Sequence, residues 1–285
     1  MNLETAAPCR HAGVAPDQII NQVIKVISQL AADPKYLGSN GLSVAEYTSA
    51  LPAAIERMRG SSSAQNADRR QFLINMFNSM LDRSLIQNFA EPDYGSDTVY
   101  RLSIKDVGDI AIIQKGCPDG AHSSTTWSVP EWAVESYLWW LCPSMAHEPG
   151  AHIAKGVGRL KQKFMRSLNE SASERFVDGV IFHNEMCGTS NRLCPKKDRS
   201  VSIGGLDVPP PCLYAFPKAD ADAKEWNWAA SRELAFPRTL FALFGISQAE
   251  LPYYGGQIGF QKKGSEIRTN ISSQYGLGKS TTLRT

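Results

Sequence analysis

The segment RFVDGVIFH, residues 175–183, combines an early acid with a short run of mostly apolar residues. A short apolar run bounded by polar residues is typical of a strand that is buried in a sheet. A second run of this kind, PPPCLYAFPK at 209–218, follows a loop that is rich in Gly and Pro. Helical patterns flank the pair at 151–175 and at 222–245, where Pro237 breaks or kinks the helix. This alternation predicts an α/β core.

The chain that precedes this core is expected to be helical over its first ninety residues. One helix opens at Pro16 and Asp17 and ends at Pro34, and the sequence SVAE at 43–46 is a capping box that begins a second. A third helical pattern runs from Asp68 to Phe89.

Two further elements are predicted between this helical region and the core. The residues 98–116 form a β-hairpin with Gly108 in its turn, and TWSVPEWAVESYLWWLC at 126–142 forms an aromatic-rich helix with Ser128 as N-cap and Pro130 as its first residue. The expected fold is therefore α/β (α+β), a mixed sheet flanked by helices. The chain is expected to form a helical N-terminal region over 1–90 and an α/β core over 91–285, either as two domains or as one continuous domain.

The composition is that of an ordinary globular protein. Of the 285 residues, 42% are hydrophobic and 20% are charged, and the formal net charge of +2 gives no whole-protein field that would select a partner. No apolar run has the length of a membrane span, and the first residues lack a signal-peptide pattern. We therefore expect a cytoplasmic protein with no membrane partner, in which six scattered cysteines form no disulfide framework.

Two cysteine-based sites are open as alternatives. Zinc is commonly bound by His and Cys side chains, and the sequence offers four of these in His183, Cys187, Cys194 and Cys212. No two of them form the close pair that structural zinc sites usually contain. A hydrogen-bonded structural histidine is the simpler reading of His183, at the end of an apolar strand. A thiol nucleophile with its base, Cys117 and His122, is the other alternative, although such partners are usually distant in sequence.

Three residues of the core have the chemistry of a magnesium-dependent phosphodiester hydrolase. Asp178 lies early in the predicted strand, Lys218 ends the second strand, and Glu233 lies in the following helix. Magnesium prefers oxygen ligands and keeps several waters, so two carboxylates suffice to hold it. The metal activates the attacking water, and a nearby lysine stabilises the negative charge that develops. Two adjacent strands and one helix are able to bring such side chains to one point.

This arrangement resembles the PD-(D/E)XK nuclease superfamily, and in particular type II restriction endonucleases in which the second acid has moved to the next helix. The resemblance covers roughly residues 150–245 and implies that Asp178 and Glu233 bind Mg²⁺ while Lys218 assists the water. The sequence departs from the family pattern at Val177, where a proline is usual, and at Phe216, where an acid or a serine is expected.

Other residues compete for these roles. The segment EPDYGSDTVYRLSIK contains Asp93 and Lys105, a rival pair that we rank second because Lys105 falls in the hairpin turn and only Asp119 follows at a comparable distance. Glu185, seven residues after Asp178, is an alternative second carboxylate.

Basic clusters before and after Asp178 favour a nucleic-acid partner, since Lys and Arg contact phosphates and Arg also reads base edges. A solvated charged face is the simpler explanation of each cluster. The candidates for contact with DNA are Lys155, Arg159, Lys163, Arg192, Lys196, Lys197, Arg199, Lys262, Lys263 and Arg268.

The function that the sequence favours is Mg²⁺-dependent cleavage of specific double-stranded DNA sequences. By the resemblance, a homodimer would cut one strand with each subunit of a two-fold symmetric site. The alternatives are a DNA-binding protein without catalysis and a zinc or thiol hydrolase.

Overall fold

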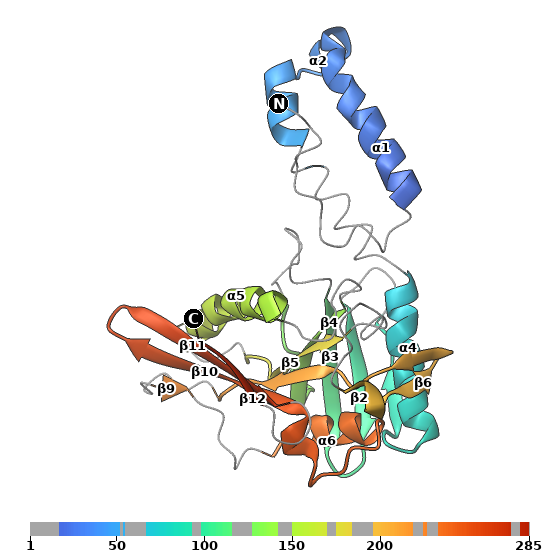
Figure 1. Cartoon of the computed structure of the whole chain (residues 1–285), viewed down its shortest axis with the longest axis vertical. Helices are drawn as coiled ribbons and strands as arrows, with labels where there is room; N and C mark the ends of the chain where they lie inside the picture. Colours follow the sequence, from blue (N-terminus) through green and yellow to red (C-terminus); the bar gives the residue numbers. More distant parts are fainter. Residues whose placement is uncertain are drawn as a thin grey trace. The chain divides into compact units, whose positions relative to one another are not determined.

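The computed structural model describes residues 17–51, 54, 67–92, 98–115, 127–141, 150–169, 175–183, 196–218, 225–226, 233–274 and 280–284 (Figure 1). By its internal contacts the chain divides into two compact units, and the boundary between the N-terminal helices and the larger unit lies between Asn66 and Ala67. The helical N-terminal region is thus confirmed. Its boundary differs from the expected residue 90, because the next helix packs on the sheet of the larger unit.

The N-terminal unit contains helix α1 (Asp17–Gln29), the 3₁₀ turn η2 (Leu30–Ala32), helix α2 (Pro34–Ser39) and further helical residues at 44–51. The predicted capping box is confirmed: the backbone N–H of Ser43 donates to Glu46 Oε2 at 2.9 Å, and that of Glu46 donates to Ser43 Oγ at 3.2 Å. The Tyr47 hydroxyl donates to the carbonyl of Ile27 at 2.5 Å, which ties the last helical stretch to α1.

The larger unit contains most of the described elements. In chain order these are α4 (Ala67–Asp82), β1 (Asn88–Ala90), β2 (Val99–Ile104), β3 (Gly108–Lys115), β4 (Glu135–Leu141), α5 (Gly150–Asn169), β5 (Gly179–His183), η3 (Lys197–Arg199), β6 (Val201–Ile203), β7 (Leu206–Val208), β8 (Cys212–Ala215), β9 (Glu225–Trp226), α6 (Ala235–Ala242), η4 (Leu251–Tyr253), β10 (Gly255–Lys263), β11 (Glu266–Gln274) and β12 (Ser280–Arg284).

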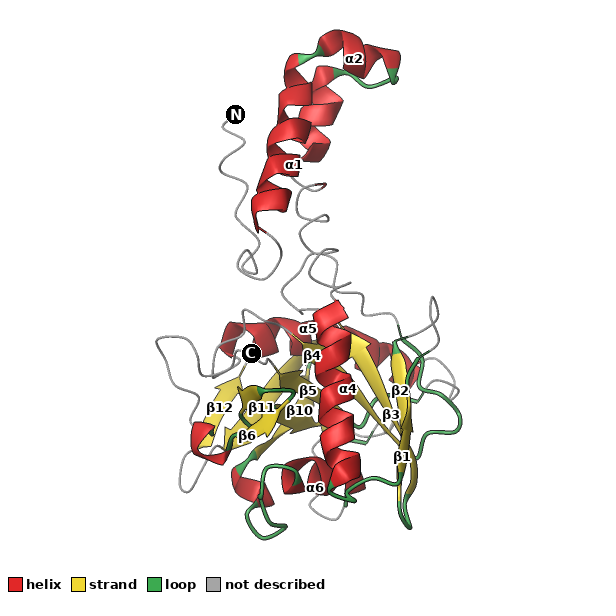
Figure 2. Cartoon of the chain, turned by 90° about the vertical axis from the view of Figure 1, so that its right-hand side faces the viewer, coloured by secondary structure: helices red, strands yellow, loops and turns green. Residues whose placement is uncertain are grey.

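The described strands other than β6 and β7 form one mixed, ten-stranded sheet (Figure 2). Its order is β1-β2-β3-β4-β5-β8-β10-β11-β12, with β9 paired to β10. Strands β3, β4 and β5 are parallel, β8 runs antiparallel to β5, and β10 is parallel to β8. The amino ends of β3, β4 and β5 and the carboxyl end of β8 therefore lie along the same edge, which we call the lower edge.

Helices cover both faces of this sheet, so the larger unit has three layers (Figures 1 and 2). Helices α4 and α6 pack on one face, against Tyr137 and Trp139 of β4. Helix α5 packs on the other face, against the alternate residues Leu138 and Trp140. Successive residues of a strand point to opposite faces, so β4 serves both cores and is buried along its whole length. The expected fold class, a mixed sheet flanked by helices, is confirmed.

The helix expected over 126–142 is wrong, because Glu135–Leu141 is strand β4 at the centre of the sheet. The signals at Ser128 and Pro130 belong to a turn, in which the N–H of Ala133 donates to the carbonyl of Pro130 at 3.1 Å. The continuous apolar run is instead that of a parallel strand buried on both faces.

Two helices are shorter than expected. Helix α4 ends at Asp82, where Ser84 has a positive φ of 56°, and the chain enters β1 before Phe89. Helix α6 begins only at Ala235, which leaves Pro237 in its first turn, where a proline costs no intrahelical hydrogen bond. The predicted hairpin is confirmed as β2 and β3, with Gly108 at a φ of 115°.

Candidate functional site

The lower edge of the sheet brings together the segments that carry Asp178, Lys218 and Glu233. Asp178 directly precedes β5, and its carbonyl accepts the N–H of Phe216 at 2.9 Å, so the β5–β8 ladder continues to the end of β8. Lys218 follows two residues later. Glu233 lies two residues before the start of α6, and it lines the same cavity as Ala215, the residue that pairs with Gly179. The topology thus places the Asp178 segment beside the end of β8, and Glu233 at the cavity that Ala215 also lines.

Asp178 is the buried member of the set, with a relative exposure of 4%. Its Oδ2 accepts the backbone N–H of Ser136 at 2.8 Å, and its own N–H donates to the carbonyl of Ser136 at 2.8 Å. This pair of bonds fixes Asp178 against the start of β4. One carboxylate oxygen therefore has a structural partner in the backbone of β4.

Lys218 and Glu233 are both exposed. The Glu233 side chain is 74% exposed and forms a long ion pair of 3.7 Å with Arg238, one turn into α6. An exposed ion pair of this length contributes little to stability, so it does not fix the Glu233 side chain. Lys218 and Glu233 are therefore both accessible to a ligand that approaches the lower edge.

The donor set fits magnesium in type. Two carboxylates provide oxygen ligands, and water supplies the remaining positions that Mg²⁺ usually keeps hydrated. The Ser136 hydroxyl, next to Asp178, is buried without a hydrogen-bond partner among the described residues, so polar capacity remains at this edge. Within the described part of the chain, no three or more His, Cys, Asp and Glu side chains form a group that could hold a metal ion.

Glu135, at the start of β4, is a residue that sequence reasoning missed. Its Oε1 accepts the N–H of Ala235 at 2.6 Å, and its Oε2 accepts the N–H of Phe236 at 3.0 Å and the hydroxyl of Tyr137 at 2.8 Å. The carboxylate thus caps α6 from a neighbouring strand, where its charge also complements the helix dipole. Glu135 positions the helix that follows Glu233. An acid in a strand that is buried on both faces is unusual. Assigning β4 as such a strand would therefore have singled out Glu135 from the sequence.

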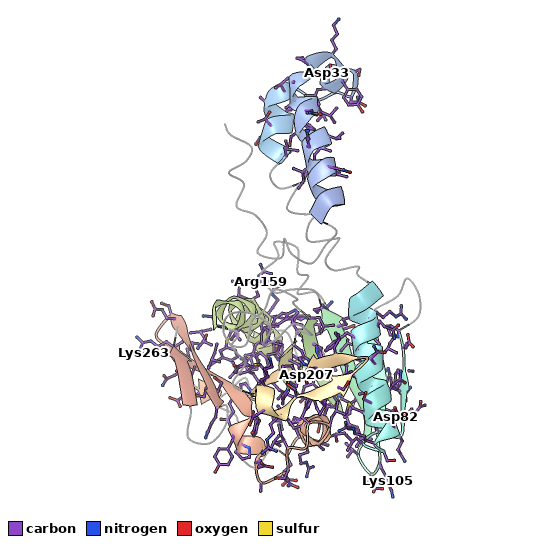
Figure 3. The ribbon with its side chains drawn as sticks, turned by 45° about the vertical axis from the view of Figure 1, so that its right-hand side comes forward. Asp33, Asp82, Lys105, Arg159, Asp207 and Lys263 are labelled. Carbon is purple, nitrogen blue, oxygen red and sulfur yellow. The ribbon has the colours of Figure 1, made fainter. Side chains whose placement is uncertain are left out.

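The rival acid Asp93 lies outside the described residues, as do Asp119 and Glu185. Lys105 is exposed in the β2–β3 turn, which Figure 3 shows far from Arg159 on α5. Among the acids of this hairpin, Asp109 is bonded within it: its Oδ2 accepts Arg101 Nε at 2.9 Å. The bonds from Arg101 and Ser103 hold the pKa of Asp109 below its ordinary value, so this carboxylate stabilises the hairpin.

His183 and Cys212 show no zinc-like arrangement. His183 is buried, and its Nε2 lies 3.0 Å from the carbonyl of Pro209, in a ring of aromatic side chains that includes Phe72 and Trp139. Burial lowers the pKa of His183 to about 3, so the ring is neutral, and the prediction of a hydrogen-bonded structural histidine is confirmed. The remaining residues of the zinc and thiol alternatives, Cys187, Cys194, Cys117 and His122, lie outside the described residues.

Lys196 was expected in a loop that faces DNA, and this is wrong for its side chain, which is fully buried. Its Nζ donates to the carbonyl of Pro211 at 2.7 Å and lies 3.1 Å from Cys212 Sγ. A lysine in this position stabilises the segment that precedes β8. It is not accessible to a phosphate.

The other basic candidates differ in the exposure and the hydrogen bonding of their side chains. Lys163 and Arg199 are held within the fold: Lys163 Nζ donates to the carbonyl of Trp127 at 2.6 Å, and Arg199 pairs with Glu250 at 2.5 Å. Arg159 on α5 is half-buried. Arg192 and the side chain of Lys155 lie outside the described part. The candidates with exposed side chains are Lys197, Lys262, Lys263 and Arg268.

The last three of these residues lie on the β10–β11 hairpin, which projects from the sheet with Lys263 near its tip (Figures 1 and 3). Strand β10 pairs with β8 from Gly255 to Gln257 and then continues beside β11 as far as Lys263. The register therefore carries this basic arm past the end of β8, from which Lys218 also follows.

No helix in the described ranges combines the length and apolar character that crossing a bilayer requires. Comparisons with protein-family models, with curated proteins and with solved structures found no match to this chain.

Proposed function

We propose that this chain is a Mg²⁺-dependent endonuclease that hydrolyses phosphodiester bonds of double-stranded DNA at specific sequences. The observation that carries the proposal is the convergence of the Asp178, Lys218 and Glu233 segments at the lower edge, from two neighbouring strands and the start of a helix. These elements are distant in the sequence, and their meeting is what the resemblance to type II restriction endonucleases implies.

Each residue has a distinct part in this mechanism. Asp178 and Glu233 would hold Mg²⁺, which when bound polarises the phosphoryl oxygen and activates water. The Lys218 ammonium orients the attacking water and stabilises negative charge that develops on the phosphate. The hydrogen bonds from Ser136 to Asp178 and from α6 to Glu135 hold the two carboxylate-bearing segments in place before the substrate arrives.

The β10–β11 arm supports a duplex as the substrate. Lys262, Lys263 and Arg268 are exposed beyond the end of β8, where they would contact phosphates on either side of the scissile bond. Cleavage of both strands by one protein then calls for two copies of the site, and a two-fold symmetric homodimer supplies them.

The burial of Asp178 favours one other function. A carboxylate that is 4% exposed and bonded to Ser136 would serve equally well as a structural acid, and the basic arm would then belong to a DNA-binding protein without catalysis.

Incubation with a phage-length DNA, in Mg²⁺ or in EDTA, separates the two functions. The endonuclease gives discrete fragments in Mg²⁺ alone. We expect Asp178→Asn, whose amide oxygen still accepts the Ser136 N–H, and Lys218→Met to slow cleavage by about a hundredfold or more. Lys105→Met, in the rival segment, is the matched control and retains full activity. Binding of DNA without cutting in several buffers would replace the endonuclease by the binding protein.

A further inference from the structure

We propose that a cavity along α6 binds a single nucleotide, with the base held between the helix and the sheet. The cavity has a volume of about 460 Å³, within the range of roughly 300–1,000 Å³ that is usual for sites of small ligands. The inference rests on the proposed function, since it assumes a nucleic-acid ligand at the lower edge, and it names the part of that ligand which the cavity binds.

Apolar side chains from both the sheet and the helix line the cavity. Leu213 and Ala215 of β8 and Phe241 of α6 are among them, and all three are buried. A lining of this kind covers the faces of a flat aromatic ring. A phosphate or a sugar alone would gain nothing from such contact, whereas a heterocyclic base would.

The sheet side of the cavity continues from β8 onto polar, amide-rich residues. Gln257 of β10, which pairs with Ala215, and Gln274 of β11 line the cavity together with Ser272 and Ser273. Each glutamine side chain offers both donors and an acceptor, as the edge of a nucleobase does. Glutamine is accordingly one of the side chains that form paired hydrogen bonds with bases.

The two charged lining residues lie at the rim, where both side chains are partly or largely exposed. Arg238 and Glu233 are 37% and 74% exposed and stand 3.7 Å apart. A guanidinium binds phosphate oxygens in a bidentate manner, so the phosphate of a nucleotide whose base occupies the cavity would meet Arg238. Glu233 is a proposed metal ligand, and the phosphate therefore lies next to the proposed site of hydrolysis.

Gly255 leaves part of this space open. A Cβ atom at Gly255 would have only the carbonyl of Leu251 within 4 Å, at 3.8 Å, and its φ does not require glycine. The next residue differs, since a Cβ at Gly256 would lie 2.4 Å from the Tyr214 ring on the other face of the sheet. A valine at position 255 thus fits the strand and reduces the volume of the cavity, which makes it a direct probe of occupancy.

The test titrates the full chain with each of the four deoxynucleoside 5′-monophosphates by calorimetry in EDTA, where no hydrolysis occurs. We expect at least one nucleotide to bind, and deoxyribose 5-phosphate to bind at least about tenfold more weakly. Gly255→Val should lower the affinity by at least about tenfold while its unfolding midpoint is unchanged. Gly158→Ala on α5, where a Cβ meets nothing within 4 Å, is the control that retains the affinity.

A second arm identifies the source of the nucleotide. A duplex that contains 2-aminopurine becomes more fluorescent when the base leaves the stack. A rise with the wild type that is absent with Gly255→Val assigns the cavity to a nucleotide extruded from DNA. Nucleotide binding without that rise assigns it to a free nucleotide.

Three results would overturn the proposal: no nucleotide binding together with no fluorescence rise, wild-type affinity in folded Gly255→Val, or equal binding of deoxyribose 5-phosphate. If Gly255→Val fails to fold, Gln257→Ala on the exposed rim replaces it with the same expectation. Asp178 does not line the cavity, so Asp178→Asn retains nucleotide binding. A wild type that binds nucleotide and never cuts DNA would refute the proposed function and leave the cavity assignment standing.

Discussion

Acidification from pH 7 to pH 5 is expected to destabilise the larger unit through His183. Burial among aromatic side chains lowers the pKa of His183 to about 3, the carbonyl of Pro209 opposes this by favouring the protonated ring, and the charge of Lys196 lowers the pKa further. In the unfolded chain the same imidazole has a pKa of about 6.5. Between these two values the unfolded state binds a proton that the folded state does not.

The sign and the size of the effect follow by linkage. A group whose pKa is depressed by folding, and which is neutral when folded, makes stability rise with pH; the contribution of His183 is complete above its unfolded pKa of about 6.5 and is lost as the pH falls toward 3. At pH 5, which is about 1.5 pH units below the unfolded pKa, protonation of His183 favours the unfolded state. The free energy of unfolding is then lower by about 2 kcal/mol.

The measurement is urea unfolding, followed by tryptophan fluorescence at pH 7, 6 and 5, since the Trp139 ring lies 5.7 Å from His183. The variant His183→Phe keeps an aromatic ring and does not titrate, so its stability should depend less on pH by about 2 kcal/mol over this range. His183→Gln serves if the phenylalanine variant does not fold. Parallel curves for wild type and variant would refute a neutral, buried His183.

Three further outcomes are expected. Glu135→Gln should lower the free energy of unfolding by about 2–4 kcal/mol in the same assay, because it weakens charge-assisted bonds to α6; an unchanged midpoint would contradict the cap. On α5, Gly156→Ala should destabilise by about 1–3 kcal/mol, since its Cβ would lie 2.7 Å from Trp140, whereas Gly158→Ala should stabilise by about 0.5–1 kcal/mol. For DNA binding, Lys263→Met should reduce the slope of log affinity against log salt by about one, and buried Lys196→Met should leave it unchanged.

The elements that could be predicted are those whose signals are local. The capping box at Ser43 and Glu46 needs only the spacing of two residues, and the hairpin needs only alternating strands around Gly108. Strand β4 was missed because Ser128 and Pro130 mimic a helix start, while the evidence for a strand lies in neighbours that are distant in sequence. The pairing of β4 with β3 and β5 overrides the local preference.

In the candidate site, too, the properties that depend on tertiary neighbours could not be predicted from the sequence. The order of strand, strand and helix predicted that Asp178, Lys218 and Glu233 meet, and this stays a prediction; the described contacts place Asp178 beside Ser136 and Glu233 beside Arg238. The accessibility of a charged side chain is a tertiary property, however, and nothing in the spacing of KKDR distinguishes buried Lys196 from exposed Lys197. Glu135 likewise gains its role only from the backbone of α6, a hundred residues later in the chain.

That distant cap has a consequence for the order of folding. Helix α6 spans only Ala235–Ala242, too short to persist alone in water, and its own N-cap residue, Leu234, provides no side-chain bond. The acceptor that completes its first turn comes from β4, so a stable α6 has to await the central strands of the sheet. The rim residues Glu233 and Arg238 would consequently reach their final positions late, and the central sheet would form before the proposed catalytic edge is complete.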